Sequence, residues 1–317
     1  MKLQTQIPLS SQPHNHIDYS SKLVLFGSCF SENIGAKLAY FKFQSLVNPV
    51  GILFHPLAIE TLISRVINKD YYTEDELVFQ NGQWSCLDAH SKLNDTSKTQ
   101  LLQNLNTALD QSYDVLCESS HVIITLGTAW VYRFLERDKL VANCHKLPQK
   151  KFLKELLSVD EINESLTAIV ALVRGINPKV SFIFTVSPVR HIKDGFVENT
   201  QSKAHLIAAI HQVVDARKQL YYFPSYELMM DDLRDYRFYN DDMLHPSSLA
   251  INYIWEKFQQ VWMTETTINT SKRIGQIQAK KAHRPFNPNS KAHQIFLEKL
   301  AREIREFQGE FPSIQLD

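Results

Sequence analysis

The sequence of 317 residues has few cysteines and no excess of charge of either sign. Its four cysteines stand far apart, at Cys29, Cys86, Cys117 and Cys144, without the C-x-x-C pairs of a zinc ribbon. This spacing also disfavours a disulfide scaffold in a chain of this length. The 34 lysines and arginines balance 34 aspartates and glutamates, so no overall field attracts nucleic acid or an anionic membrane. We predict neither of these partners.

Long apolar runs are missing as well. The polar start of the chain, residues 1–22, lacks the apolar core of a secretory signal. No apolar segment approaches the roughly 20 residues that are needed to span a bilayer. We therefore expect a soluble, cytoplasmic protein.

Signals for a bound metal or cofactor are weak. Four histidines offer an alternative metal site, namely His55, His90, His145 and His245. None of them shows the close spacing of a zinc motif such as His-x-x-x-His beside a glutamate. The segment "GSCFSENIG" lacks the lysine of a phosphate-binding loop. We predict no metal and no cofactor.

What the sequence does contain is a series of short apolar runs that alternate with helical patterns. The runs are rich in β-branched and aromatic residues without strict alternation, which is typical of strands covered on both faces. They end at Phe26, Leu126, Val186 and Phe223, and a weaker candidate ends at Val47. Residues 158–177 and 199–218 have helical patterns. We predict a three-layer α/β/α domain with an open parallel sheet.

In such a sheet, right-handed crossovers place the carboxyl ends of all strands along one edge. The residues that follow the strands should therefore converge at one crevice. They are residues 27–29, 48–51, 127–128, 187–191 and 224–225.

The character of the chain changes near its end. We predict one domain over residues 1–268 and a C-terminal helical extension over residues 269–317. The last helix should place Phe296, Leu300 and Ile304 on one stripe. This stripe would pack on the domain or on a second subunit, which makes a homo-oligomer the expected protein partner.

Two candidate nucleophiles, Ser28 and Cys29, follow a glycine at the first strand-to-helix turn. Gly27 permits a tight turn, and the free N–H groups at a helix N-terminus favour negative charge. Such a position can stabilise an oxyanion and lower the pKa of a cysteine. The alternative interpretations are an N-cap for Ser28 and a small buried apolar side chain for Cys29.

A second feature is Asp242, three residues before His245. At this spacing the carboxylate can accept a hydrogen bond from the imidazole, fix its tautomer and stabilise its protonated form. The alternative is an Asp–His pair that only caps the following helix.

The two features together have the layout of SGNH (GDSL-type) hydrolases. Six ordered segments more closely resemble the GSCFA family, from about Leu25 to beyond Pro285. They are "FGSCFSENIG", "NPVGILFHP", "ITLGTAWVY", "ANCHKLP", "TVSPVRH" and "NDDMLHPS".

This resemblance implies an SGNH-hydrolase-like (flavodoxin-like) fold. It also implies an acyl-ester hydrolase or O-acyltransferase that forms an acyl-enzyme on an ester-bearing small molecule or carbohydrate. The superfamily serine stands two positions after the turn glycine, so register favours Cys29 as the nucleophile, with Ser28 as the alternative. Asp242 and His245 complete the implied triad.

The resemblance further implies an oxyanion amide at Gly51. The asparagine of the third superfamily block is missing, and Thr128 or Asn48 could replace its hydrogen bond. The missing asparagine also favours an alternative function, a binding protein that keeps the fold without turnover.

Other polar side chains are candidates for substrate contacts. Arg190 and His191 follow a strand, and an arginine there could bind a carboxylate or phosphate through two hydrogen bonds. Aromatic and imidazole groups on loops suit sugars or planar ligands. These candidates are His55, Trp84, His90 and His145.

Overall fold

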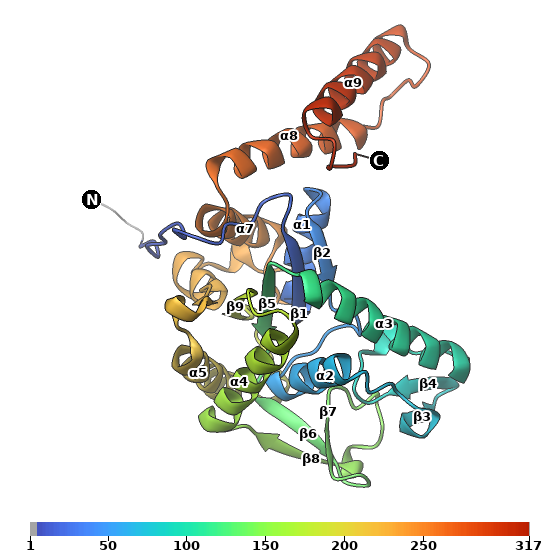
Figure 1. The fold of residues 1–317 in the computed structure, drawn as a ribbon, viewed down its shortest axis with the longest axis vertical. Coiled ribbons are helices and arrows are strands. Elements are labelled where there is room, and N and C mark those ends of the chain that lie inside the picture. Colours follow the sequence, from blue (N-terminus) through green and yellow to red (C-terminus); the bar gives the residue numbers. More distant parts are fainter. Residues whose placement is uncertain (1–4, 317) are drawn as a thin grey trace.

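A computed structural model describes residues 5–316 of the chain. At its centre lies a parallel sheet with the order β10-β9-β5-β1-β2 (Figure 1). Its strands are β1 (Lys22–Gly27), β2 (Gln44–Val47), β5 (His121–Leu126), β9 (Ser181–Val186) and β10 (Leu220–Tyr222). In chain order this is the 2-1-3-4-5 arrangement of a flavodoxin-like doubly wound sheet. The predicted fold class is confirmed, and all five predicted strands lie in this sheet.

Helices cover both faces of the sheet. On one face Leu23 and Leu25 pack against α1 (Cys29–Tyr40) and α7 (Ser248–Trp262). On the other face Val24 and Phe26 belong to a larger core with four helices. These are α2 (Pro56–Asn68), α3 (Lys98–Glu118), α4 (Val159–Ile176) and α5 (Phe196–Val213). Since every residue of β5 and β9 is buried, apolar runs without alternation were the expected signal.

The start of α4 shows why the sequence folds as it does locally. The Ser158 hydroxyl accepts the N–H of Glu161 at 3.2 Å, and the Glu161 carboxylate accepts the N–H of Ser158 at 2.8 Å. This reciprocal pair is a capping box, which satisfies two donors that the first turn leaves free. The other predicted helix, α5, begins three residues before the predicted start, at Phe196.

Two smaller sheets were not predicted. A hairpin joins β3 (Leu77–Gln80) to β4 (Gln83–Cys86), and β6 (Trp130–Phe134) pairs with β7 (Lys139–Val141) and β8 (Phe152–Leu156). These strands are short and partly exposed, so they lack the apolar runs of the central strands.

The C-terminal helices α8 (Glu265–Lys281) and α9 (Lys291–Glu310) project from the sheet domain (Figure 1). Leu300 is buried against α8, and Phe296 and Ile304 are partly buried in the same cluster. The Tyr40 hydroxyl donates to the Gly275 carbonyl at 3.3 Å, which links α8 to the end of α1. The predicted boundary between residues 268 and 269 falls within the first turn of α8, and the division into two domains stays a prediction. No helix within residues 5–316 has the length and apolarity to cross a membrane.

The first strand ends in a backbone arrangement that requires glycine. Gly27 has φ +134°, and a Cβ built on it would lie 2.1 Å from the Thr125 carbonyl oxygen. The Gly27 N–H donates to Asn48 Oδ1 at 2.9 Å, and its carbonyl accepts the N–H of Leu53 at 3.0 Å. The ends of β1, β2 and β5 are thus held together at this residue.

Replacing Gly27 by alanine should therefore lower the free energy of unfolding by at least about 3 kcal/mol, because strain and a backbone clash add together. Urea unfolding checks this. Gly175→Ala is the matched control, since Gly175 lies in α4 with no atom within 4 Å of the new Cβ. It should raise stability by about 0.5–1 kcal/mol. Equal effects of the two substitutions would contradict the role assigned to Gly27.

Candidate active site

Cys29 lies at the point where the order of the sheet reverses. It is the first residue of α1, two positions after the last residue of β1, while Gly127 follows the neighbouring strand β5. In open α/β sheets, ligands bind outside the carboxyl ends of the strands at this switch point. The predicted crevice edge and the first candidate nucleophiles therefore coincide.

Ser28 is the N-cap of α1. Its hydroxyl accepts the N–H of Phe30 at 3.2 Å, and its own N–H donates to the Thr125 carbonyl at 3.0 Å. The residue is 0% exposed. Its hydroxyl serves the helix, as the N-cap interpretation anticipated.

The Cys29 thiol is half-buried, and its pKa is raised. Burial is the largest cause, and the charge of Glu32 acts in the same direction. The N–H groups of Cys29 and Phe30 and the charge of Lys203 lower the pKa, but they do not overcome burial. Cys29 is therefore a thiol at neutral pH and needs a base to become a nucleophile.

Asp242 and His245 form a hydrogen-bonded pair in the loop before α7. His245 Nδ1 lies 2.6 Å from Asp242 Oδ2, and Asp242 Oδ1 accepts the N–H groups of His245 and Leu244 at 2.9 Å each. These backbone bonds are the main reason that the pKa of Asp242 falls to about 2, and the imidazole adds to the effect. An ionised carboxylate keeps the proton of the neutral ring on Nδ1. Nε2 takes part in no hydrogen bond of the described residues, and it is free to act as a base.

The loop after β9 contacts the loop that carries Asp242 and His245. The Arg190 N–H donates to the Leu244 carbonyl at 3.5 Å, next to His245. The pKa of His191 is lowered to about 3 by burial and then by the charges of Lys203 and His245. His191 is therefore neutral, and its buried Nε2 has no partner among the described residues.

Of the three residues expected to supply oxyanion donors, Asn48 has an unpartnered one. Its Oδ1 accepts the Gly27 N–H, so the amide orientation is fixed and Nδ2 is the remaining donor. That nitrogen is buried and has no hydrogen-bond acceptor within the described chain. A buried donor without an acceptor is rare and calls for an explanation.

The other two expected donors are held elsewhere. The Gly51 N–H donates to the Asn48 carbonyl at 2.7 Å and closes a turn. The Thr128 N–H donates to the Phe54 carbonyl at 3.0 Å, and its hydroxyl accepts the N–H of Trp130 at 3.0 Å. In this structure neither residue offers its backbone N–H to a substrate.

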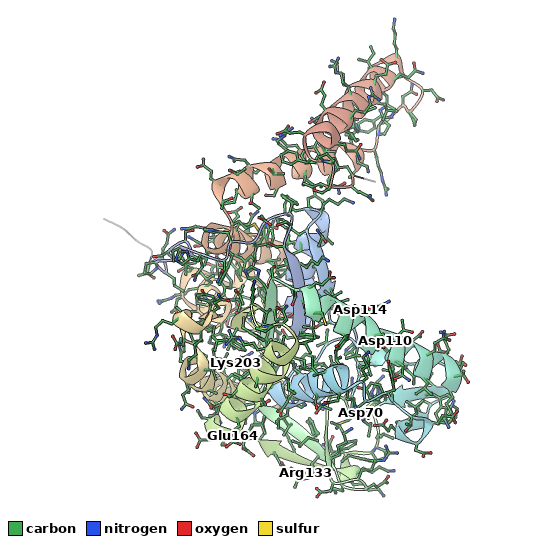
Figure 2. All side chains as sticks on the ribbon, viewed as in Figure 1. Asp70, Asp110, Asp114, Arg133, Glu164 and Lys203 are labelled. Atoms are coloured by element: carbon green, nitrogen blue, oxygen red, sulfur yellow. The ribbon has the colours of Figure 1, made fainter. Side chains whose placement is uncertain are left out.

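Lys203, on α5, was not among the predicted site residues. It is 1% exposed, and Nζ donates to the carbonyls of Gly127 at 2.7 Å and Ser187 at 2.8 Å, which follow β5 and β9. Figure 2 labels Lys203 in the sheet domain. Burial lowers its pKa to about 7. Its spacing to Leu206 and Ile210, on the buried face of the helix, was the signal in the sequence.

The remaining predicted substrate residues lie outside the central sheet. His55 is buried as the N-cap of α2, with Nε2 3.1 Å from the Val141 carbonyl, so it does not reach the crevice. Trp84 packs against Phe79 in the β3–β4 hairpin, away from the strand ends. His145 Nε2 lies 2.7 Å from the Cys86 carbonyl. His90 packs on Gly51 and borders the crevice.

These histidines do not assemble a metal site. Across residues 5–316, no group of three or more His, Cys, Asp or Glu side chains could hold a metal ion. The Nε2 atoms of His55 and His145 contact backbone carbonyls, at Val141 and Cys86 respectively.

Comparison with protein families agrees with this architecture. The model of the GSCFA family matches residues 22–258, and the model of the "GSCFA domain protein, C-terminal domain" matches residues 274–317. The chain belongs to the GSCFA family. A search of curated proteins finds no relative of this GSCFA chain.

Among solved structures, this GSCFA chain resembles a Clostridium thermocellum family 3 carbohydrate esterase, with 11% identity and a TM-score of 0.36. The similarity covers 80% of this chain and 98% of that one. A carbohydrate esterase family 3 protein from Talaromyces cellulolyticus gives 11% identity, the same two coverages and a TM-score of 0.37. An acetyl esterase S10A mutant with acetate ion gives 11% identity, 80% and 99% coverage and a TM-score of 0.36.

The buried charge of Lys203 predicts a distinct pH dependence of stability. Its pKa is about 7 in the folded protein and returns to the ordinary value on unfolding. Below pH 7 the full cost of the buried charge is present. Above it the unfolded chain binds the extra proton, so the free energy of unfolding rises by up to about 1.4 kcal/mol per pH unit.

Lys203→Met should lack this rise. The measurement is the difference in urea-unfolding free energy between wild type and variant, followed from about pH 6 to pH 9. Lys179→Met, at an exposed lysine, is the control and should keep the slope of the wild type. Identical slopes for wild type and Lys203→Met would contradict the assignment.

Proposed function

We propose that the protein is an acyl-transfer enzyme that attacks an ester or thioester through Cys29. The observation that carries this proposal is the Asp242–His245 pair, whose Nε2 has no hydrogen bond within the described residues. It is supported by the contact of the adjacent Leu244 with Arg190 after β9, and by Cys29 at the N-terminus of α1 after β1. An oriented imidazole and a thiol in such a position are the parts that nucleophilic catalysis needs. Asp242 is a positioning residue in this scheme.

The raised pKa of Cys29 determines the order of events. Since the thiol is protonated at rest, His245 Nε2 takes its proton as the sulfur attacks the carbonyl carbon. The C–O or C–S bond to the leaving group then breaks, and the imidazolium returns its proton to that group. Asp242, ionised above about pH 2, stabilises the imidazolium throughout.

The carbonyl oxygen becomes negatively charged in the tetrahedral intermediate. We assign its stabilisation to Asn48 Nδ2, which lacks an acceptor, and to the N–H of Cys29 at the start of α1. Water or an acceptor hydroxyl then attacks the acyl carbon while His245 Nε2 takes its proton, and the C–S bond to Cys29 breaks as the imidazolium returns the proton to the sulfur. Water makes the protein a hydrolase, and a hydroxyl of a small molecule or carbohydrate makes it an O-acyltransferase.

A binding protein without turnover is the second candidate. The observation in its favour concerns Thr128, the residue expected to replace the missing asparagine. The Thr128 N–H is bound to the Phe54 carbonyl and is not available to a substrate. One oxyanion donor fewer costs about 3 kcal/mol of transition-state stabilisation. The free donor of Asn48 favours the enzyme.

Turnover of p-nitrophenyl acetate tests the nucleophile and its base. Cys29→Ala and His245→Ala should reduce the rate to background, and Asp242→Asn should reduce kcat by about 10²–10⁴-fold because the imidazole loses its orientation. Cys117→Ala, at a cysteine in α3, is the matched control and should keep the rate of the wild type.

Substitution of the neighbouring serine separates the two nucleophiles. Ser28→Ala should lower stability by about 1 kcal/mol as a lost N-cap, with turnover per folded molecule retained. Loss of turnover in Ser28→Ala together with full activity in Cys29→Ala would make Ser28 the nucleophile. Activity independent of Cys29, Ser28 and His245 with every acyl donor would favour the binding protein.

The role of Asn48 has its own test. Asn48→Asp keeps an oxygen for the Gly27 N–H and tolerates the positive φ of 44°, but it replaces the Nδ2 donor. We expect kcat to fall by about 10²–10³-fold with a smaller change in KM. Asn68→Asp, on the exposed end of α2, is the control. An unchanged kcat in Asn48→Asp would remove Asn48 from the mechanism.

A further inference from the structure

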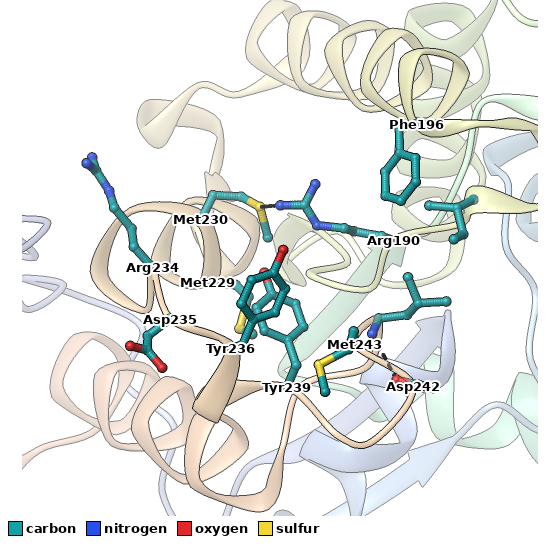
Figure 3. A pocket seen from close by; sticks show the side chains of 12 residues that line it. Arg190, Phe196, Met229, Met230, Arg234, Asp235, Tyr236, Tyr239, Asp242 and Met243 are labelled. Carbon is teal, nitrogen blue, oxygen red and sulfur yellow. Dashed lines mark hydrogen bonds between the residues drawn. The ribbon is translucent and has the colours of Figure 1, made fainter.

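A pocket of about 520 Å³ opens beside the Asp242–His245 pair (Figure 3). It lies between the loop after β9, the helical segment Leu228–Asp232 and the loop that carries Asp242. Its volume is within the range of small-molecule sites. Since Asp242 itself forms part of the wall, a ligand in this pocket lies next to the Asp242–His245 pair.

The charged side chains of the pocket wall differ in whether they have an ion-pair partner. Four charged side chains line the pocket, and two of them have partners of opposite charge. Arg234 pairs with Asp231 and Asp235 pairs with Arg237, whereas Asp242 is hydrogen-bonded to the His245 ring. Arg190 belongs to no ion pair formed by residues 5–316. Arg190 is therefore the one cation of the wall that no carboxylate of the described residues pairs with.

Within residues 5–316, the one side-chain hydrogen bond of Arg190 is to a weak acceptor. Its Nη2 lies 3.0 Å from the thioether sulfur of Met230, and Figure 3 shows this contact at the wall of the pocket. A guanidinium has five N–H donors in a planar fork, which suits a carboxylate or phosphate. Most of these donors are thus without a partner in the described structure.

The rest of the wall is apolar and aromatic. Phe196 is 63% exposed and Tyr236 is 75% exposed, although both border the pocket. Met229, Met230 and Tyr239 add flexible and planar surfaces. Such a wall suits an apolar or aromatic body that is attached to the charged group.

We propose that the pocket selects an anionic substrate, an ester or thioester in which a carboxylate or phosphate is joined to an apolar or aromatic portion. Arg190 binds the anion, and the methionine and tyrosine side chains contact the apolar portion. The ester part of this statement rests on the proposed function, whereas the anion site stands on the pocket alone. Neutral sugar esters are then poorer substrates than charged ones.

The anion site is tested first by binding, without turnover. Isothermal titration calorimetry on the Cys29→Ala protein compares phenyl phosphate and benzoate with neutral benzamide. We expect at least one anion to bind about tenfold or more tightly than benzamide, and the tighter of the two identifies the charged group. The added substitution Arg190→Gln should abolish this preference.

Arg217→Gln is the matched control for binding, since Arg217 is 91% exposed and pairs with Asp215. It should keep the preference for the anion. Equal binding of all three probes to the Cys29→Ala protein with Arg190 intact overturns the proposal. A preference for the anion that survives the added Arg190→Gln substitution also overturns it. Arg190→Lys, which keeps the charge but not the fork, should restore part of the preference.

A kinetic comparison on otherwise active protein uses 4-acetoxybenzoate and its neutral methyl ester. Arg190→Gln should lower kcat/KM for the anion by about 10–100-fold and for the neutral ester by less than about twofold. Equal losses with both donors overturn the anion site in favour of a structural role. If neither donor shows turnover that depends on Cys29, the acyl-transfer proposal fails while calorimetry still decides the anion site.

Discussion

The close contact between the Gly27 backbone and the Thr125 carbonyl is the constraint on which the site depends. A side chain cannot occupy this place, because its first carbon would lie 2.1 Å from the carbonyl oxygen. The contact lets α1 begin directly above the switch point of the sheet, with Ser28 as its cap and Cys29 as its first residue. The N–H of the same glycine donates to Oδ1 of Asn48. The Nδ2 group of that amide therefore remains as a donor without an acceptor among the described residues. One backbone turn thus positions both the thiol and a candidate oxyanion donor.

Burial shifts the pKa values of three groups close to the strand ends, and in each case it favours the uncharged form. It raises the pKa of the Cys29 thiol and lowers those of His191 and Lys203. A preformed pair of thiolate and imidazolium is not the resting state of such a site. In the proposed mechanism the more exposed Asp242–His245 pair accepts the proton of the thiol during the reaction, as a general base does.

The central sheet and the Asp–His pair could be predicted from the sequence because both are local patterns. A buried strand is a short apolar run, and three residues separate Asp242 from His245. The contacts of Lys203 and Asn48 could not, since their partners lie on strands and loops that are distant in the sequence. The sequence offered only the helical spacing of Lys203, and it offered Asn48 only as a candidate donor. The hairpin and the three-stranded sheet were missed because their strands are short and partly exposed, so hydrophobic periodicity carries little signal there.

The exposure of His245 bears on which nucleophile resolves an acyl-enzyme. Its side chain is 45% exposed, so water reaches the ring unless another molecule covers it. A transferase therefore needs its acceptor to occupy the pocket beside Asp242 before the acyl group is released. Tyr236 and Met243, both exposed on that wall, offer the surface that an acceptor would cover. Under the proposed mechanism, an uncovered imidazole favours hydrolysis, and transfer requires a bound acceptor that excludes water from the imidazole.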